Sequence, residues 1–261
     1  MNCPYFYAPR DHIKEPGGEL ILDGNEYRHL RSSLRKRIGD VIEVTDGTGW
    51  VYSAKIKAFA KASALCTVLE AREEKPQLQV QLSICLGLLH QPARFDVAVE
   101  KLTELGVSKI VPLITERSVI PPQVGRLNRW KGIAISALKQ SRRTLLPVID
   151  EPTPLTSILQ QGNPHILQLV LHEKASSEAT LRQIILSAFR HEEHSELRLF
   201  IGPEGGFSDD EIRAMQLVSH VHIVSLGKFR LRSETAAIVA AAIAVQTIEE
   251  IYANRQAVLK G

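Results

Sequence analysis

From about residue 79 onward, apolar segments of strand length alternate with longer segments of helical periodicity. Such alternation is typical of parallel strands joined by crossover helices, so it predicts an α/β fold for this part of the chain. The loops that follow the strands should then meet at one edge of a sheet, where α/β proteins bind their ligands. The expected strands are 80–86, 109–114, 167–171, 197–201 and 221–226, and the expected helices are 94–105, 129–141, 179–190, 209–218 and 234–253.

Residues 1–72 have a different pattern, in which short alternating or apolar runs are separated by turns that contain glycine. One helix is expected among them, over 25–37. This pattern predicts a small β-rich, barrel-like domain over 1–72, followed by a second domain over 73–261. The charged segment 70–75, which ends at Pro76, is the expected linker between them.

Composition excludes several classes of protein. The chain has 261 residues, 44% of them hydrophobic, and a formal net charge of +3, as is typical of a soluble globular protein. Its three cysteines form no CxxC pair, and its paired histidines do not match HExxH, so no metal is expected. The start of the chain lacks the features of a signal peptide, and the longest apolar run, 236–245, is about half of what spans a bilayer. We expect a cytoplasmic protein that makes no membrane contact.

A glycine-rich segment, GPEGGF over 202–207, lies between an expected strand and an expected helix. Ser208 and Glu211 have the spacing of a capping box at the start of that helix. Such a turn lets a ligand approach the backbone, although the same residues also suit a simple tight turn. A phosphate would be repelled by the acidic residues around the turn, whereas a sulfonium or a zwitterion would be tolerated. These acidic residues are Glu204, Asp209, Asp210 and Glu211.

A basic segment, LGKFRLRSETA over 226–236, joins the last expected strand to the last expected helix. Because both segments follow parallel strands, they are expected to open onto one crevice. The alternative is a basic surface loop with Ser233 as the cap of the helix. Glu100 and Glu104, one helical turn apart, suit either acid–base chemistry or a solvated helix face.

Two basic runs contain no acidic residue, one over 28–37 and the other over 126–143. Basic clusters on each domain would follow a phosphate backbone, which favours a nucleic acid as partner over the alternative of solvated helix faces.

Several segments together resemble the RsmE family, which consists of 16S ribosomal RNA (uracil-N3)-methyltransferases of the SPOUT superfamily. In chain order they are EKLTELGV, PLITERSV, RWKGIAISALKQSRR, FIGPEGGFSDDEI and LGKFRLRSETA. In the first domain, HLRSSLRKRIGDVIEVTDGTG resembles the PUA-like RNA-binding module of that family. The resemblance covers nearly the whole chain, and the glycine loop and the LRxETA segment are specific when they occur together.

The resemblance implies a fold class and a reaction. The fold is α/β, with a SPOUT-type knotted parallel sheet flanked by helices and a C-terminal trefoil knot, preceded by the PUA-like barrel. The expected reaction is transfer of a methyl group from S-adenosyl-L-methionine to N3 of a specific uridine in 16S ribosomal RNA of the 30S subunit. The resemblance also implies a homodimer and places Glu100, Glu104 and Gly106 on a helix beside the site.

The resemblance also assigns roles to single residues. Arg232 and Arg230 would hold the negative charge that develops on the uracil, and Glu234 or a water would accept the N3 proton. RNA contacts are expected from His29, Arg35, Arg94 and Arg142. Methyl-donor contacts are expected from Leu171, Ile201, Gly202, Pro203, Glu204, Gly205, Leu226, Gly227, Leu231 and Arg232.

The chain departs from the family at three positions. Phe229 stands where the family usually has an arginine, and Arg230 follows it. Ser233 replaces a threonine and Gln91 replaces a lysine. Three alternatives therefore stay open: a SPOUT enzyme that modifies another RNA position or a ribose, a non-catalytic RNA-binding assembly factor, and a nucleotide-dependent enzyme that uses the glycine loop.

Overall fold

The computed structural model describes residues 5–14, 17–74, 78–118, 125–160, 163–176, 178–191, 194–218 and 220–260. Contacts within the chain divide it into two compact units. Unit 1 contains Met1–Pro76 together with Ile135–Leu146, and unit 2 contains Gln77–Ala134 together with Pro147–Gly261. Unit 1 is therefore built from two separate stretches of sequence, and helix α3 (Arg126–Ser141) supplies residues to both units.

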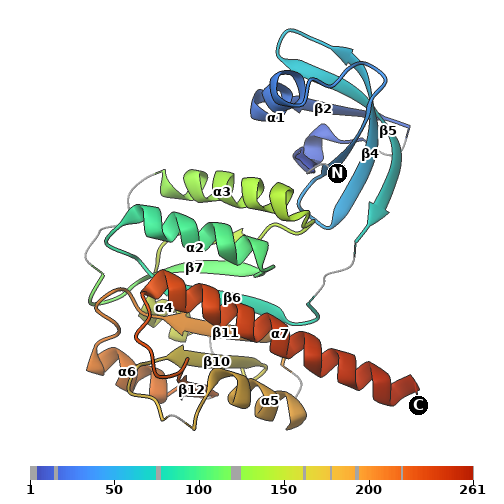
Figure 1. Ribbon diagram of the computed structural model, residues 1–261. Helices are drawn as coiled ribbons and strands as arrows, with labels where there is room; N and C mark the ends of the chain where they lie inside the picture. The colour runs from blue at the N-terminus through green and yellow to red at the C-terminus, as the bar shows by residue number, and fades with distance from the viewer. Residues whose placement is uncertain are drawn as a thin grey trace. The chain divides into compact units, whose positions relative to one another are not determined.

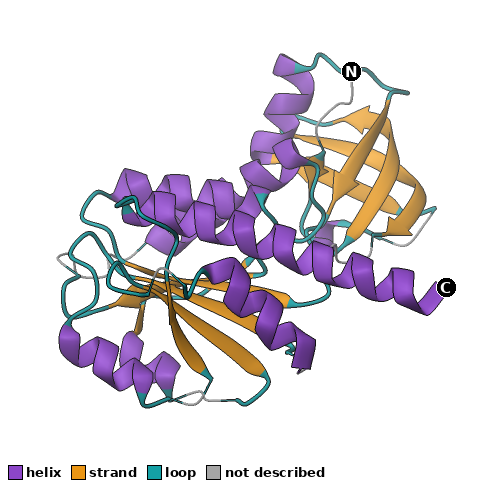
Figure 2. Ribbon diagram, turned by 60° about the horizontal axis from the view of Figure 1, so that its bottom comes forward, coloured by secondary structure: helices purple, strands orange, loops and turns teal. Residues whose placement is uncertain are grey.

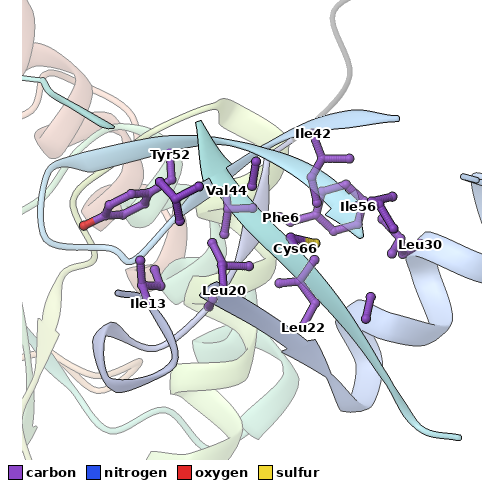
Figure 3. Close-up of a cluster of buried hydrophobic side chains, with 14 residues drawn as sticks. Phe6, Ile13, Leu20, Leu22, Leu30, Ile42, Val44, Tyr52, Ile56 and Cys66 are labelled. Atoms are coloured by element: carbon purple, nitrogen blue, oxygen red, sulfur yellow. The ribbon is translucent and has the colours of Figure 1, made fainter. Parts of the chain in front are cut away.

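Unit 1 contains a five-stranded sheet in the order β1-β3-β4-β5-β2. All neighbouring strands are antiparallel except β1 and β3. Along β5, buried residues alternate with more exposed ones up to Val68, so that one face of the strand supplies the core, and Cys66 lies in that core with Leu20, Val44 and Ile56 (Figure 3). The strands are β1 (Phe6–Tyr7), β2 (Glu19–Asp23), β3 (Val41–Thr45), β4 (Trp50–Phe59) and β5 (Ser63–Glu73).

Two expectations for this unit need correction. The predicted linker is wrong over Glu70–Glu73, because these residues extend β5 and pair with Trp50–Ser53 of β4. The helix expected over 25–37 is shorter: α1 (Gly24–Arg28) continues as a wider helical turn (His29–Ser33) and then ends. It ends there because Arg35 has a φ of 51°, in the left-handed region. A 3-10 turn (Arg10–His12) precedes β2.

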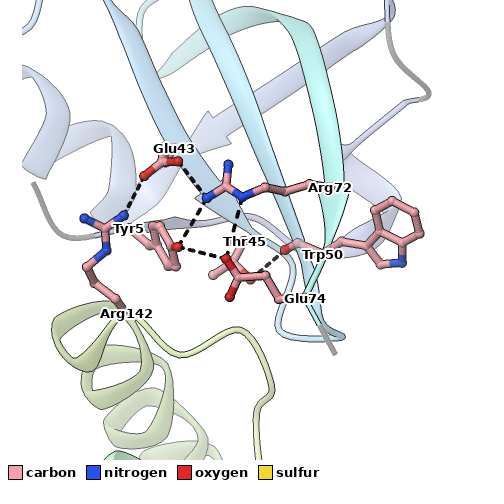
Figure 4. A network of polar contacts seen from close by, with 7 residues as sticks. All are labelled: Tyr5, Glu43, Thr45, Trp50, Arg72, Glu74 and Arg142. Carbon is pink, nitrogen blue, oxygen red and sulfur yellow. Dashed lines mark hydrogen bonds and ion pairs between the residues drawn. The ribbon is translucent and has the colours of Figure 1, made fainter. Parts of the chain in front are cut away.

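A network of charged and aromatic side chains holds the second stretch of unit 1 (Figure 4). The Glu43 carboxylate accepts hydrogen bonds from the Nη2 atoms of Arg72 and Arg142, each at 2.8 Å. Arg142 also lies over the Tyr5 ring, 4.8 Å from its centroid. The basic run over 126–143 thus faces acidic partners from distant parts of the sequence, and Lys139, which pairs with Glu26, is another case.

Unit 2 contains a seven-stranded sheet in which every pairing is parallel, as the alternation of strands and helices predicts (Figure 1). The order is β12-β10-β11-β6-β7-β8, and β9 pairs with β7. Nearly every residue of the four central strands is buried, as expected for strands covered on both faces. The strands are β6 (Gln81–Gly87), β7 (Lys109–Ile114), β8 (Val148–Ile149), β9 (Thr153–Pro154), β10 (Ile166–Leu171), β11 (Glu196–Ile201) and β12 (Val221–Val224).

Helices cover both faces of this sheet (Figure 2). On one face, α7 packs against α2, α5 and the central strands through buried alanines such as Ala240 and Ala244. On the other face, α4 and α6 share an apolar cluster with the strands, to which Ile158 and Met215 belong. The helices are α2 (Pro92–Glu104), α4 (Leu155–Leu159), α5 (Leu181–His191), α6 (Asp209–Gln216) and α7 (Ser233–Lys260).

Helix α7 is much longer than the apolar run that marks it in the sequence. By length and composition alone, Ser233–Ala257 would be long and apolar enough to cross a membrane. Core helices of soluble proteins meet the same criterion, and α7 contacts α2, α5 and the sheet through buried residues such as Ala240 and Ala244.

Candidate functional site

The parallel sheet brings the predicted site residues to one edge. Leu171 and Ile201 are the last residues of the adjacent strands β10 and β11, and Leu226 follows β12, which flanks β10 on its other side. The glycine loop (202–207) and the basic loop (226–232) therefore both leave the carboxyl edge of the sheet. This edge is where parallel α/β sheets bind their ligands.

The glycines of the first loop allow close packing of one backbone segment on another. Gly206 has a φ of +67° and donates its N–H to the Pro203 carbonyl at 2.8 Å. A Cβ on Gly202 would lie 2.9 Å from the Gly206 carbonyl carbon, and one on Gly87 would lie 2.5 Å from Pro203. Gly87, at the end of β6, did not stand out in the sequence, because only the folded sheet places it against Pro203.

The capping box at the start of α6 is confirmed. The Ser208 hydroxyl accepts from the Glu211 N–H at 3.2 Å, and the Glu211 carboxylate accepts from the Ser208 N–H at 2.8 Å. The other Glu211 oxygen accepts from the backbone N–H of Glu116 at 2.8 Å. The Ser208 and Glu211 side chains thus accept hydrogen bonds from backbone N–H groups that could otherwise bind an anion.

Loops that follow β6 and β7 hold the glycine loop in place. The Glu204 carboxylate accepts the His90 N–H at 3.1 Å and lies 3.8 Å from Nη1 of Arg94. Arg117 donates to the Gly205 carbonyl at 2.8 Å. Glu204 and Glu211 therefore bind groups of the protein, so not all four acidic residues act as free charges around the loop. The sequence did not mark His90, and it marked Arg117 only as part of the PLITERSV segment without a role, since the partners of both residues lie far along the chain.

Arg94 also connects to the start of α7. Its Nε atom lies 3.7 Å from Oε1 of Glu234, so that its guanidinium lies between the carboxylates of Glu204 and Glu234. Glu234 is only 8% exposed, and its Oε2 atom has no hydrogen-bond partner among the residues that the structure describes. A buried carboxylate oxygen without a donor is costly, so a water, a ligand or a proton is needed at this atom.

The basic loop is exposed along most of its length. It turns at Gly227, which has a φ of +117° and whose N–H bonds to the Ser225 hydroxyl at 3.1 Å. Phe229 is 89% exposed. Arg230 pairs with Glu173 at 3.8 Å on the open surface, while Arg232 is exposed just before the buried Glu234.

The other predicted residues lie elsewhere or have partners. The His29 ring contacts the Phe6 ring at 5.8 Å, and Arg35 is exposed; both belong to unit 1. Lys101 binds both Glu100 and Glu104, at 2.7 and 2.8 Å, and these bonds, the one to Glu100 most of all, raise the pKa of Lys101 to about 12. The two glutamates thus share a lysine, as structural ion pairs do.

No group of three or more metal-binding side chains occurs within the described ranges. One predicted histidine pair is His191 and His194, and the two residues between them, Glu192 and Glu193, lie outside those ranges. A cavity of about 850 Å³ opens at the amino edge of the sheet, opposite the glycine loop, and His165, His194, His220, Tyr252 and Arg255 contribute to its lining. Because the unpartnered carboxylate and both predicted loops lie at the carboxyl edge, we assign the site there.

Comparison with known proteins identifies the class to which the chain belongs. The profile of a family described as "RNA methyltransferase domain" matches residues 76–245, and that of "RNA methyltransferase PUA domain" matches residues 22–69. The chain is thus an RNA methyltransferase with a PUA domain. Within that class, it belongs to the ribosomal RNA small subunit methyltransferase E family.

Named relatives of this family cover most of the chain. The protein of Synechocystis sp. is 32% identical over 227 residues, which are 85% of this chain and 71% of the relative. That of Rickettsia conorii is 29% identical, over 86% of this chain and 87% of the relative.

Solved structures give the same result. The ribosomal RNA small subunit methyltransferase E of Neisseria gonorrhoeae, bound to S-adenosyl methionine, has a TM-score of 0.81 and 29% identity, and the match covers 95% of this chain and 98% of that one. A methyltransferase of Legionella pneumophila in complex with the same cofactor has a TM-score of 0.81 and 27% identity, over 94% and 97% of the two chains.

Proposed function

We propose that this enzyme methylates N3 of a specific uridine in 16S ribosomal RNA of the small subunit, with S-adenosyl-L-methionine as the methyl donor. The observation that carries the proposal is Glu234, a buried carboxylate with one unpartnered oxygen at the edge of the sheet that holds the glycine loop. The named relatives act on ribosomal RNA of the small subunit, and two similar structures bind this donor.

The carboxyl edge suits this donor in shape and polarity. Leu171, Ile201 and Leu226 provide apolar side chains at adjacent strand ends. Among the described residues, apart from the glycine itself and its two chain neighbours, no heavy atom lies within 4 Å of the position of a Cβ on Gly206 or Gly227. When bound, S-adenosyl-L-methionine supplies a methyl group on a cationic sulfur, which leaves as a neutral thioether. We propose as donor-binding residues Leu171, Ile201, Gly202, Pro203, Glu204, Gly205, Leu226, Gly227, Leu231 and Arg232.

Glu234 is our candidate for the proton acceptor. N3 of uracil carries a proton, which must leave when the bond from N3 to the methyl carbon forms. Oε2 of Glu234 has no donor among the described residues and is our candidate atom for that proton, while Oε1 faces Arg94. Arg232 and Arg230 are exposed on the preceding loop, where they would stabilise negative charge on the uracil oxygens.

Arg94 has a different role in this proposal from the one that the sequence suggested. Its guanidinium lies between Glu204 and Glu234, with its side chain 26% exposed. We propose that it positions Glu234 and links it to the glycine loop, and that RNA contacts come from His29 and Arg35. Arg142 pairs with Glu43 inside unit 1, so we infer a structural role for it.

The same proposal includes the finer features of the family. Residues 1–72 would form a PUA-like RNA-binding domain, and residues 73–261 would form the methyltransferase domain with a C-terminal SPOUT trefoil knot. The enzyme would act in the cytoplasm. Two copies would pair through the side of α7 that carries the half-buried Ile238, Val239 and Ile243, away from its buried alanines.

Methylation of defined substrates tests the proposed function. Small subunits and free 16S RNA from cells that lack the enzyme would be incubated with labelled S-adenosyl-L-methionine and digested for mass spectrometry. We expect one labelled nucleoside, N3-methyluridine, at a single position. Label on a ribose or on another base would replace our reaction with another SPOUT activity. Absence of label, together with no heat of S-adenosyl-L-methionine binding, would favour an assembly factor.

A further inference from the structure

Phe229 stands out at the tip of the basic loop. Its side chain is 89% exposed, more than any other large hydrophobic residue among the described ones. A single exposed apolar residue is common on protein surfaces and proves nothing by itself. Phe229 is distinguished by its place in the basic loop of the site. Leu217, which is 88% exposed, lies just past the end of α6 and outside both loops of the site.

The neighbours of Phe229 in the loop are cations. Lys228, Arg230 and Arg232 are all exposed, and Arg230 has an acidic partner, Glu173, at 3.8 Å. That pair is open to solvent on both sides, with side chains 83% and 64% exposed, so salt and water screen it strongly. The loop therefore presents an aromatic face among positive charges, which is the combination that binds single-stranded nucleic acid.

The distance from Phe229 to the proposed proton acceptor is limited by the chain. Glu234 is five positions after Phe229, and even a fully extended chain spans no more than roughly 18 Å over that length. Phe229 is thus within reach of the target base or of a nucleotide next to it. An enzyme that acts on a base within RNA needs that base unpaired, and aromatic side chains stabilise unpaired bases by stacking.

From these observations we propose that Phe229 stacks on an unpaired base of the RNA substrate, at or beside the target uridine, while the exposed Lys228 binds a phosphate of that RNA. The inference rests on the proposed function, because it assumes an RNA substrate at this edge of the sheet. It gives this chain a stacking residue at a position where the family usually has an arginine.

The test compares four variants: Phe229→Ala, Phe229→Leu, Phe229→Trp and, as a control of equal exposure outside the loop, Leu217→Ala. Single-turnover methylation would be measured over a range of small-subunit concentrations, and S-adenosyl-L-methionine affinity by calorimetry. Loss of one stacked base weakens binding by about 10-fold to 100-fold. We therefore expect the half-saturating substrate concentration to rise by that factor in Phe229→Ala and Phe229→Leu. It should stay near the wild-type value in Phe229→Trp and Leu217→Ala, and the donor affinity should be unchanged in all four variants.

Each other outcome overturns the inference. Wild-type binding by Phe229→Ala, or rescue by leucine as good as by tryptophan, would exclude stacking. A dimer that dissociates in Phe229→Ala, seen by sedimentation, would make Phe229 an interface residue, and loss of donor affinity would make it part of the donor site. If the wild-type enzyme itself does not methylate RNA, the proposed function fails instead, so the two failures are distinguishable.

Discussion

Ion pairs in the two units are built differently. In unit 1, Glu43 binds Arg72 and Arg142 at 2.8 Å each, and Arg142 also packs on Tyr5. In unit 2, Arg94 approaches Glu204 and Glu234 only to 3.7–3.8 Å, and Glu234 keeps an oxygen without a partner among the described residues. The first set is closed, as in a structural network, whereas the second is open and has capacity left for a ligand or a proton.

The substitution Glu234→Gln tests the open set with the largest expected effect. The amide keeps the shape but cannot accept the proton, so the single-turnover rate at saturating substrates should fall by about 100-fold or more. Thermal stability should not fall, because a buried charge is removed. Glu100→Gln, in an exposed pair with Lys101, is the matched control. A rate within threefold of wild type would show that the open oxygen has no catalytic use.

Gly202→Ala tests whether the glycine loop must keep its shape. The new Cβ would lie 2.9 Å from the Gly206 backbone, so the loop has to shift. We expect donor affinity, measured by calorimetry, to fall by about tenfold or more, which corresponds to about 1.4 kcal/mol. Gly132→Ala, in helix α3, is the control, since no heavy atom of the described residues beyond its own helix lies within 4 Å of the new Cβ. Equal effects of the two substitutions would contradict the packing argument.

Arg94 distinguishes positioning from RNA binding. If it positions Glu234, Arg94→Ala should lower the methyl-transfer rate by about tenfold, which corresponds to about 1.4 kcal/mol in the activation barrier. The half-saturating RNA concentration should stay nearly unchanged. Arg94→Lys should recover part of the rate, because it keeps the charge. A raised half-saturating concentration with a weaker dependence on salt would instead make Arg94 an RNA contact, as the sequence suggested.

Arg142→Ala tests the closed set. Its ion pair is about one-third exposed on each side, so we expect a loss of roughly 1 kcal/mol in the stability of unit 1 and no change in the methyl-transfer rate. Urea unfolding followed by Trp50 fluorescence, in a Trp130→Phe background, would report on unit 1. Lys61→Ala is the control, because Lys61 is exposed and belongs to the same unit. An unchanged unfolding midpoint with weaker RNA binding would return Arg142 to the RNA surface.

The smallest expected effect concerns the buried thiols of the two units. Burial raises the pKa of Cys66, in unit 1, from 9.0 to about 11 and that of Cys85, in unit 2, to about 12. The unfolded chain therefore releases these protons first, so their contribution to stability is constant below pH 9 and is lost as pH rises from 9 towards 12. At pH 8 both thiols should react with iodoacetamide far more slowly in the folded than in the unfolded protein. Mass spectrometry of the two peptides measures both rates, and rapid labelling of either would show that its core opens easily.

The sequence predicted elements with strong local signals and missed those fixed by distant contacts. The strand Lys109–Ile114 and the capping box of Ser208 follow from neighbouring residues. The two-residue strands β8 and β9 are too short to have a periodicity. The basic run over 126–143 looked unpaired because its partners Glu26, Glu43 and Asp96 lie far away in sequence. The same is true of the site, where the sequence marked Glu234 and the glycine loop but not Gly87 or His90, and gave no role to Arg117.

The divided sequence of unit 1 affects how the enzyme is made. A ribosome that has released residues 1–76 has not yet delivered Ile135–Leu146, so Glu26 and Glu43 must wait for Lys139 and Arg142. At roughly 5–20 residues per second, that delay lasts several seconds. During this interval the nascent barrel lacks its last segment, while β6, α2 and β7 of the next unit are already emerging. A fragment cut at residue 72 would remain in that unfinished state permanently.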